Sequence, residues 1–219
     1  MMRKQWIYLQ YPRFLFADFC FHRAKKTYLS SETVRAVLEE DMKKYLPKSL
    51  RNKKINNYSL NYLLANDKVF RNVFYFRLEQ CKKTQSMISK SISKAILSPQ
   101  NNIEIGINGL GEIGGGLRIV HSMGCVVAVA SAGNNLTVHQ GVTIGVSNYS
   151  PDDMRFSPVL GNNVTVFANA VIAGGITIGD NVVIGAGSVV MRNVPDNCTV
   201  IGNPAYIVKL NGEKVSIKL

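Results

Sequence analysis

The chain has 219 residues, enough for one large domain or two modest ones, and a net charge of +12. Its four cysteines are widely scattered with no pair at metal-ligand spacing, which argues against a metal module or a disulfide framework. No stretch resembles a secretory or membrane-spanning segment, because the apolar run 6–22 is short and is interrupted by Pro12, Arg13 and Asp18. We therefore expect reduced cysteines and a cytoplasmic protein, either free or at the inner face of the membrane.

Composition divides the chain into two halves that meet near Pro99. All 18 glycines follow residue 100, whereas the first hundred residues hold twenty of the 26 Lys and Arg and seven of the 14 acids, a net charge of +13. We predict a helical N-terminal domain over residues 1–98, a second domain over 99–206 and a short C-terminal tail over 207–219.

The front half predicts helices because it lacks Gly and has few Pro residues. Residues 31–33 are suited to cap a helix that runs to Pro47, and segments 58–64, 69–81 and 84–97 are further candidates. Three interpretations of the basic charge stay open: a solvated surface, peripheral membrane contact through the aromatic and basic segment 3–26, or attraction to an anionic glycan or its lipid-linked precursor. Nucleic acid is not expected, since no binding motif accompanies the charge.

From Leu160 to Val189 the chain repeats every six residues, as LGNNVT, VFANAV, IAGGIT, IGDNVV and IGAGSV. Six residues form one short strand and a turn, and three such strands close a triangular coil whose aliphatic positions point inward. Coils of this kind stack about 4.8 Å apart, like strands in a sheet. The fold class is therefore mainly β: a parallel β-helix of hexapeptide repeats behind an α-helical N-terminal domain.

Motifs in the second half carry a family resemblance. The segment 184–208 (IGAGSVVMRNVPDNCTVIGNPAYIV) closely resembles the terminal signature of hexapeptide acyltransferases. GLRIVHSMG at 116–124, VHQGVTIG at 138–145 and SPVLGNNVTV at 157–166 resemble the serine acetyltransferase branch. The resemblance covers about residues 100–210 and implies a left-handed β-helix, a homotrimer or a multiple of trimers, and acetyl-CoA bound between neighbouring β-helices.

The resemblance places the catalytic base at His121, since imidazole is the side-chain group suited to taking a proton from an attacking hydroxyl near neutral pH. His139 follows eighteen residues later, which is three repeats of six. If the six-residue period is unbroken, His139 stacks below His121 as an accessory acceptor residue; a shift in the period would move it to another face of the coil. Glu104 is the candidate that orients His121, with a backbone carbonyl as the alternative. His22 is expected to have no chemical role.

Departures from serine acetyltransferases bear on the acceptor. Val120 stands where that branch has an aspartate, and Arg155-Phe156-Ser157 stands where it has charged contacts to the amino acid. Because a zwitterion buried without charged partners loses several kcal/mol, this slot favours a sugar. We predict an O-acetyltransferase that acts on a sugar hydroxyl in capsule, exopolysaccharide or lipopolysaccharide biosynthesis. The alternatives are a serine acetyltransferase of cysteine biosynthesis and a non-catalytic scaffold.

The resemblance also implies the cofactor contacts. Acetyl-CoA is expected to run along small residues, with its phosphates toward basic side chains and no metal in the site; the candidates are Gly145, Ala168, Gly185, Ala186, Arg192 and Lys209. The backbone N–H of Gly145 is the candidate donor to the oxyanion.

Overall fold

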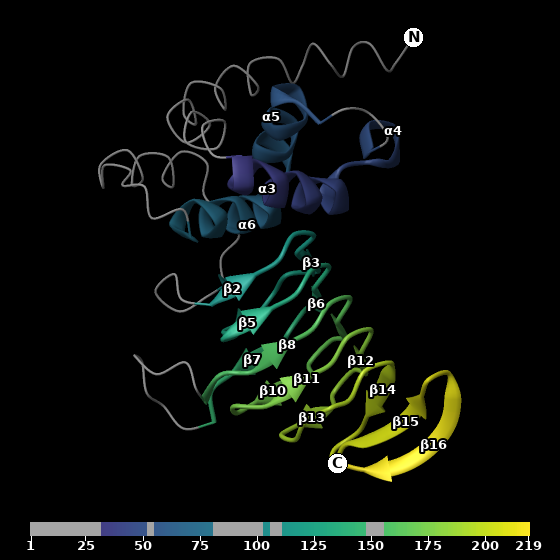
Figure 1. Ribbon diagram of the computed structural model, residues 1–219. Helices are drawn as coiled ribbons and strands as arrows, with labels where there is room; N and C mark the ends of the chain where they lie inside the picture. Colours follow the sequence, from purple (N-terminus) through teal and green to yellow (C-terminus); the bar gives the residue numbers. More distant parts are fainter. Residues whose placement is uncertain (1–31, 52–54, 81–102, 106–110, 148–155) are drawn as a thin grey trace. The chain divides into compact units, whose positions relative to one another are not determined.

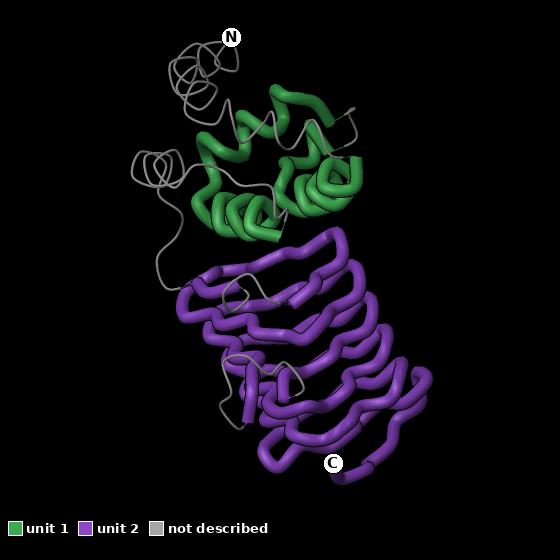
Figure 2. Tube along the Cα trace, turned by 60° about the vertical axis from the view of Figure 1, so that its left-hand side comes forward, with its two compact units in different colours: residues 1–100 green, residues 101–219 purple. Residues whose placement is uncertain are grey.

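The computed structural model describes residues 32–51, 55–80, 103–105, 111–147 and 156–219. The chain forms two compact units, residues 1–100 and 101–219 (Figure 2). The aromatic and basic segment 3–26, the predicted helix 84–97 and Arg155 lie outside the described residues. Within the described part, no helix is both long and apolar enough to cross a membrane.

The described part of the first unit is helical, as its composition predicts. Its helices are α3 (Glu32–Tyr45), α4 (Lys48–Arg51), α5 (Asn57–Asn66) and α6 (Lys68–Gln80). They confirm the helices predicted up to Pro47 and over 58–64 and 69–81, with ends shifted by one or two residues. Their apolar faces form one core: Leu38, Met42, Leu46, Leu60, Leu63, Leu64, Phe70, Phe74 and Tyr75.

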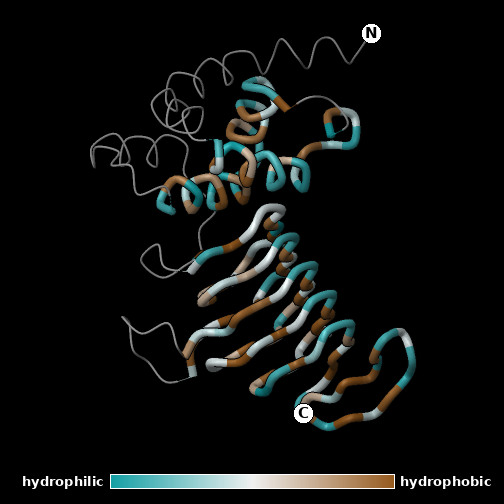
Figure 3. Tube along the Cα trace, in the orientation of Figure 1, coloured by the Kyte–Doolittle hydropathy of each residue, from teal (hydrophilic) through white to brown (hydrophobic). Residues whose placement is uncertain are grey.

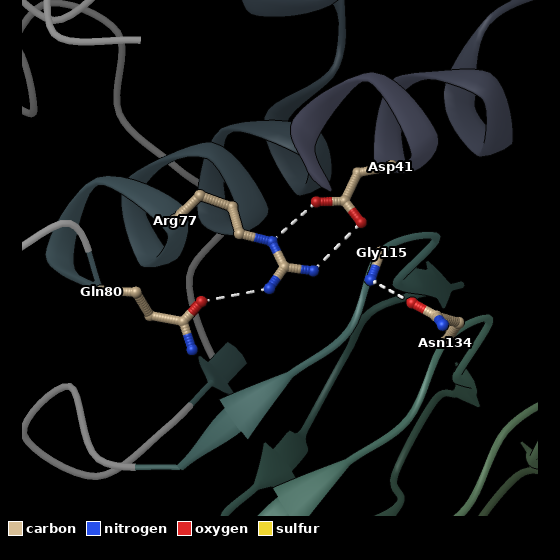
Figure 4. Close-up of polar contacts among 5 residues, drawn as sticks. All are labelled: Asp41, Arg77, Gln80, Gly115 and Asn134. Carbon is tan, nitrogen blue, oxygen red and sulfur yellow. Dashed lines mark hydrogen bonds and ion pairs between the residues drawn. The ribbon is translucent and has the colours of Figure 1, made fainter. Parts of the chain in front are cut away.

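A buried ion pair joins α3 to α6 inside this unit (Figure 4). The guanidinium of Arg77 donates to both carboxylate oxygens of Asp41, at 2.8 and 3.1 Å, and also to the side chain of Gln80 at 3.1 Å. Two parallel charge-assisted hydrogen bonds fix the geometry of both side chains. The pair therefore helps to set how α3 lies against α6 beside the apolar core.

The second unit is a β-helix of three sheets (Figure 1). Sheet 1 consists of β1 (Ile103–Ile105), β4 (Cys125–Val127), β7 (Thr143–Gly145), β10 (Val171–Ala173) and β13 (Val189–Val190). Sheet 2 consists of β2 (Glu112–Ile113), β5 (Ser131–Ala132), β8 (Val159–Leu160) and β11 (Thr177–Ile178). Sheet 3 consists of β3 (Arg118–Val120), β6 (Thr137–His139), β9 (Thr165–Val166), β12 (Val183–Ile184), β14 (Cys198–Ile201), β15 (Tyr206–Leu210) and β16 (Glu213–Lys218).

The aliphatic residues of the repeat fill the interior of the coils, as predicted. The residues that open the five repeat blocks are at most 3% exposed: Leu160, Val166, Ile172, Ile178 and Ile184. Neighbouring coils pair in parallel, so that Val166 lies beside Val138 on one side and Ile184 on the other. The hydropathy colouring shows apolar segments recurring at equivalent places in successive coils (Figure 3). Burial of these aliphatic columns is what stabilises the β-helix.

Asparagine ladders hold the corner where the chain passes from sheet 2 to sheet 3. The side chains of Asn135, Asn163, Asn181 and Asn197 form a chain of hydrogen bonds at 3.0 Å each. All four residues have positive φ, a conformation that asparagine adopts more readily than most residues. The residue before a ladder asparagine also contacts the preceding coil through its side-chain oxygen. The side-chain oxygen of Asn134, for example, accepts from Gly115 N–H at 2.9 Å (Figure 4).

The end of the chain extends sheet 3 in a different way. Residues 206–218, most of which we predicted as a short tail, form strands β15 and β16. Both pair in an antiparallel manner, β15 with β14 and β16 with β15, whereas all earlier pairings in the β-helix are parallel. A short turn at Asn211 and Gly212, both with positive φ, permits the reversal.

Candidate active site

The candidate site residues gather at two different corners of the coil. The histidine corner consists of the turns that lead from sheet 3 to sheet 1, at residues 120–124, 139–141, 167–169 and 185–187. The loop corner is where the chain leaves sheet 1 toward sheet 2, and the candidates there belong to residues 145–147, 156–158 and 191–193. The order of strands in the three sheets separates these corners within one chain.

Successive turns of the histidine corner stack in register. Gly141 N–H donates to Met123 O at 2.8 Å, Asn169 N–H to Gln140 O at 3.0 Å, and Gly187 N–H to Ala168 O at 2.9 Å. The same turn position is therefore occupied in order by Met123, Gln140, Ala168 and Ala186. The preceding position is occupied by Val120, His139, Phe167 and Gly185, since β3 pairs with β6 and the following strands continue the register.

His121 lies in a turn that is wider than the one next to it. Between the stacked positions Val120 and Met123 the chain has two additional residues, whereas His139 and Gln140 are adjacent in sequence. His121 is exposed with φ +50°, and its carbonyl accepts from Met123 N–H at 2.7 Å. The widened turn thus carries the imidazole out of the regular coil, where a substrate can reach it.

His139 lies beside Val120 rather than directly below His121, because the strand register is offset by 19 residues here instead of 18. Its ring stacks on Phe167 with 4.8 Å between centroids and 27° between planes, and the Sγ of Cys125 donates to its carbonyl at 3.2 Å. Burial, assisted by the charges of His121 and Arg118, lowers the pKa of His139. A neutral imidazole of fixed orientation therefore lies next to the candidate base.

Two residues absent from the sequence-based predictions belong to this corner. Phe167 holds the ring of His139, and Arg118 is close enough for its charge to act on that ring. The repeat could have indicated both, because Phe167 holds the position equivalent to His139 in the next coil, and Arg118 is two residues before Val120 on the same strand.

Glu104 and His121 are not brought into contact by the described residues. Glu104 is exposed on β1, where it pairs with Val126 in sheet 1. No hydrogen bond or ion pair joins its carboxylate to His121 in the described part of the chain. Its role in orienting the imidazole stays a prediction.

Phe156, Ser157 and Gly145 lie at the loop corner. Phe156 is 37% exposed and Ser157 is buried. A Cβ added to Gly145 would meet no atom within 4 Å, so the absence of a side chain there leaves open space. Val120 lies at the other corner, so one chain does not form the single slot of Val120, Phe156 and Ser157 that the sequence suggested.

The remaining cofactor candidates divide in the same way. Ala168, Gly185 and Ala186 lie at the histidine corner. A Cβ on Gly185 would approach the Ile201 side chain to 2.8 Å, so a larger residue there would require Ile201 to shift. Arg192 is exposed at the loop corner, and Lys209 is exposed on β15 opposite Lys214. Among the described residues, no group of three or more potential ligands could hold a metal ion.

The coils are those of a hexapeptide transferase. A profile of the family "Bacterial transferase hexapeptide (six repeats)" matches residues 157–192. Among curated proteins, serine acetyltransferase of Synechococcus elongatus is 43% identical over 105 residues, 48% of this chain and 42% of that protein. The Bacillus subtilis serine acetyltransferase is 40% identical over 104 residues, 47% of each chain. The chain thus spans just under half the length of these curated relatives.

Solved structures extend the similarity to most of the chain. Neisseria gonorrhoeae serine acetyltransferase in complex with serine is 30% identical with a TM-score of 0.62, over 87% of this chain and 73% of that one. The soybean apoenzyme is 27% identical with a TM-score of 0.64, over 84% and 72%. The chain therefore belongs to the serine acetyltransferase family of hexapeptide acyltransferases.

These relatives contradict the sugar acceptor that we predicted from the sequence, because the curated and solved proteins described above are all serine acetyltransferases. Polysaccharide biosynthesis is therefore not supported. The prediction rested on an apolar slot of Val120 and Phe156, which lie at different corners of one chain, and it took no account of the cation of Arg118 near the histidines.

Proposed function

We propose that this protein is an acetyl-CoA-dependent O-acetyltransferase whose acceptor is L-serine, with His121 as the general base. The observation that carries the proposal is the exposed imidazole in the widened turn 120–124, in a chain that belongs to the serine acetyltransferase family. Histidine is the side chain most often used for proton transfer near neutral pH.

The reaction follows from the chemistry of an alcohol and a thioester. The free imidazole nitrogen of His121 takes the proton of the serine hydroxyl as its oxygen attacks the acetyl carbonyl carbon. The tetrahedral intermediate then breaks its carbon–sulfur bond, and the CoA thiolate takes the proton from the imidazolium. The products are O-acetylserine and CoA, and His121 is left neutral for the next turnover.

The turns of the histidine corner that carry small residues, Ala168 and Ala186, suit the pantetheine arm of acetyl-CoA. Its stacked turns change from Met123 and Gln140 to Ala168 and Ala186, so side-chain bulk decreases away from His121. Small residues let a ligand approach the backbone donors and acceptors closely. Gly145, with open space at its Cβ position, provides a second such approach at the loop corner, where its N–H is the candidate donor to the oxyanion.

A trimer would unite the two corners. The candidates Gly145, Phe156, Ser157 and Arg192 lie at the loop corner, and His121 lies at the histidine corner. A cyclic assembly places the same two patches of neighbouring copies against each other at every interface. We therefore propose that each site uses the histidine corner of one copy and the loop corner of the next.

The test of this function is CoA release from acetyl-CoA with and without L-serine. His121→Asn removes the base, and asparagine tolerates the φ of +50°, so the turn is expected to stay folded. We expect serine-dependent release to fall by about 10²- to 10⁴-fold. Lys218→Gln, an exposed change on β16, is the control and should keep wild-type activity. Serine-dependent release that survives in His121→Asn would remove His121 from the mechanism; no release by folded wild-type trimer would overturn the proposed function.

A further inference from the structure

Arg118 lies on the same outer face of sheet 3 as the histidine corner. Residues two apart on a strand point to the same side, and the intervening Ile119 is 4% exposed, so Arg118 and Val120 both face outward. The register pairs Arg118 with Thr137 and Val120 with His139. Arg118 and His139 are thus diagonal neighbours whose Cα atoms are about 8 Å apart, given the spacing of strands and residues in a sheet.

Arg118, His121 and His139 form one basic cluster. The charges of Arg118 and His121 both act on the His139 imidazole, which places each of them within electrostatic reach of that ring. Among the described residues, no ion pair joins any of the three to a carboxylate. The outward positions of the parallel strands of sheet 3 hold no acid either; they are Thr137, Thr165, Val183, Thr199, Ile201 and, in the turns, Phe167 and Gly185.

A permanent positive charge that no carboxylate of the described residues pairs, close to a candidate base, is suited to bind an anionic group of a substrate. A guanidinium binds a carboxylate with two parallel hydrogen bonds and cannot lose its proton at any working pH. Arg118 is three residues from His121, at the reacting end of the site. The phosphates of CoA are separated from the thioester by the whole pantetheine arm, so a carboxylate on the acceptor is the anion that this position fits.

We propose that Arg118 binds the carboxylate of the acceptor amino acid and so determines that the acceptor is an amino acid. The proposal rests on the proposed function, because it concerns the acceptor of the same reaction. Val120 replaces the acid that the family resemblance implies before the base, and Arg118 lies beside it on the same face. Arg118 thus supplies a charged contact to the amino-acid zwitterion. Judged from the sequence alone, such charged contacts were missing.

The first test compares L-serine with L-serinamide, which has the same hydroxyl but no carboxylate. For Arg118→Gln we expect kcat/KM for L-serine to fall on the order of 10- to 100-fold, the loss of a charge-assisted hydrogen-bonded pair. The value for L-serinamide and the KM for acetyl-CoA should stay unchanged. Arg118→Lys should recover part of the loss, and Lys218→Gln should match the wild type. An equal fall for both acceptors, or a rise in the KM for acetyl-CoA alone, would overturn the proposal, the latter in favour of a CoA phosphate.

The second test does not depend on turnover. L-alanine is serine without the reacting hydroxyl, so its binding measured by calorimetry reports recognition of the amino acid alone. We expect wild type to bind L-alanine and Arg118→Gln to bind it on the order of 10- to 100-fold more weakly. Equal affinities, or no binding to wild type, would overturn the role of Arg118. If serine turnover fails while L-alanine binding depends on Arg118, the proposed reaction is wrong and the carboxylate site stands.

Discussion

At the scale of single residues, the side-chain oxygen of Gln140, in the turn that follows His139, is buried without a hydrogen-bond partner among the described residues. A buried acceptor without a donor destabilises the folded state by about 1 to 3 kcal/mol. Gln140→Met keeps the length of the side chain and removes the oxygen. We therefore expect it to raise the free energy of unfolding by about 1 kcal/mol, measured by urea denaturation with an unchanged m-value. A loss of stability would mean that the amide makes a favourable contact.

The His139 imidazole gives stability a specific pH dependence. Its pKa is lowered in the folded state, chiefly by burial, so the unfolded chain binds the proton more tightly. Stability therefore rises with pH, and the contribution of His139 is lost as the pH falls below the unfolded value of about 6.5. We expect His139→Gln to lose less stability than wild type between pH 7.5 and about 5.5. Parallel curves for the two proteins would show that His139 titrates alike in both states.

Phe167 explains why His139 keeps this environment. Ring stacking at 4.8 Å covers one face of the imidazole, and the neighbouring charges of Arg118 and His121 oppose its protonation. A neutral His139 retains one nitrogen that accepts and one that donates. It is therefore suited to contact a neutral or positive group of the acceptor, while Arg118 takes the negative one.

At the scale of elements, the asparagine ladder is the device that holds successive turns together. Asn181 donates to Asn197 and accepts from Asn163, at 3.0 Å each, with φ +55°. Asn181→Ala loses both hydrogen bonds and forces alanine into the left-handed region, so we expect a loss of about 2 kcal/mol. Asn181→Gly loses the same bonds without backbone strain and should cost about 1 kcal/mol. Thermal unfolding of the two variants measures both effects, and equal losses would show that the φ angle contributes nothing.

The repeat predicted the elements well and the turns poorly, for a physical reason. Inward positions such as Val166 and Ile184 depend on a six-residue period that each strand satisfies locally, and the sequence displays that period directly. The relation of His121 to His139 depends on the width of one turn, and the additional residues at 121 and 122 occur where the period is already weak. The sequence therefore identified the candidate base, while the register of its neighbours required the structure.

The acceptor prediction failed for a related reason. Val120 and Phe156 are separated by one coil and a long connection, and sequence alone does not say at which corner each one lies. Arg118 lies inside the motif 116–124, but the family resemblance assigns it no role, so it was not among the candidates. Its position on the outer face beside Val120 follows only from the pairing of β3 with β6.

At the scale of the whole molecule, the separation of the two corners makes the assembly testable through activity. Gly145→Leu fills open space in a single chain, so the fold should persist, but it blocks the approach to the backbone at the loop corner. His121→Asn disables the other corner. If each site combines the histidine corner of one copy with the loop corner of the next, trimers made of either variant alone should be inactive.

Mixed trimers should recover activity. Whichever variant is in the majority, every trimer that contains both has one of its three interfaces between an intact histidine corner and an intact loop corner, so we expect purified mixed trimers to have about a third of wild-type activity. Co-expressing the variants with two different affinity tags and purifying over both isolates the mixed species, and native mass spectrometry confirms their composition. A chain carrying both substitutions, mixed with the His121→Asn chain, supplies no intact histidine corner and serves as the inactive control. Mixed trimers that are as inactive as this control would show that each site is completed within one chain.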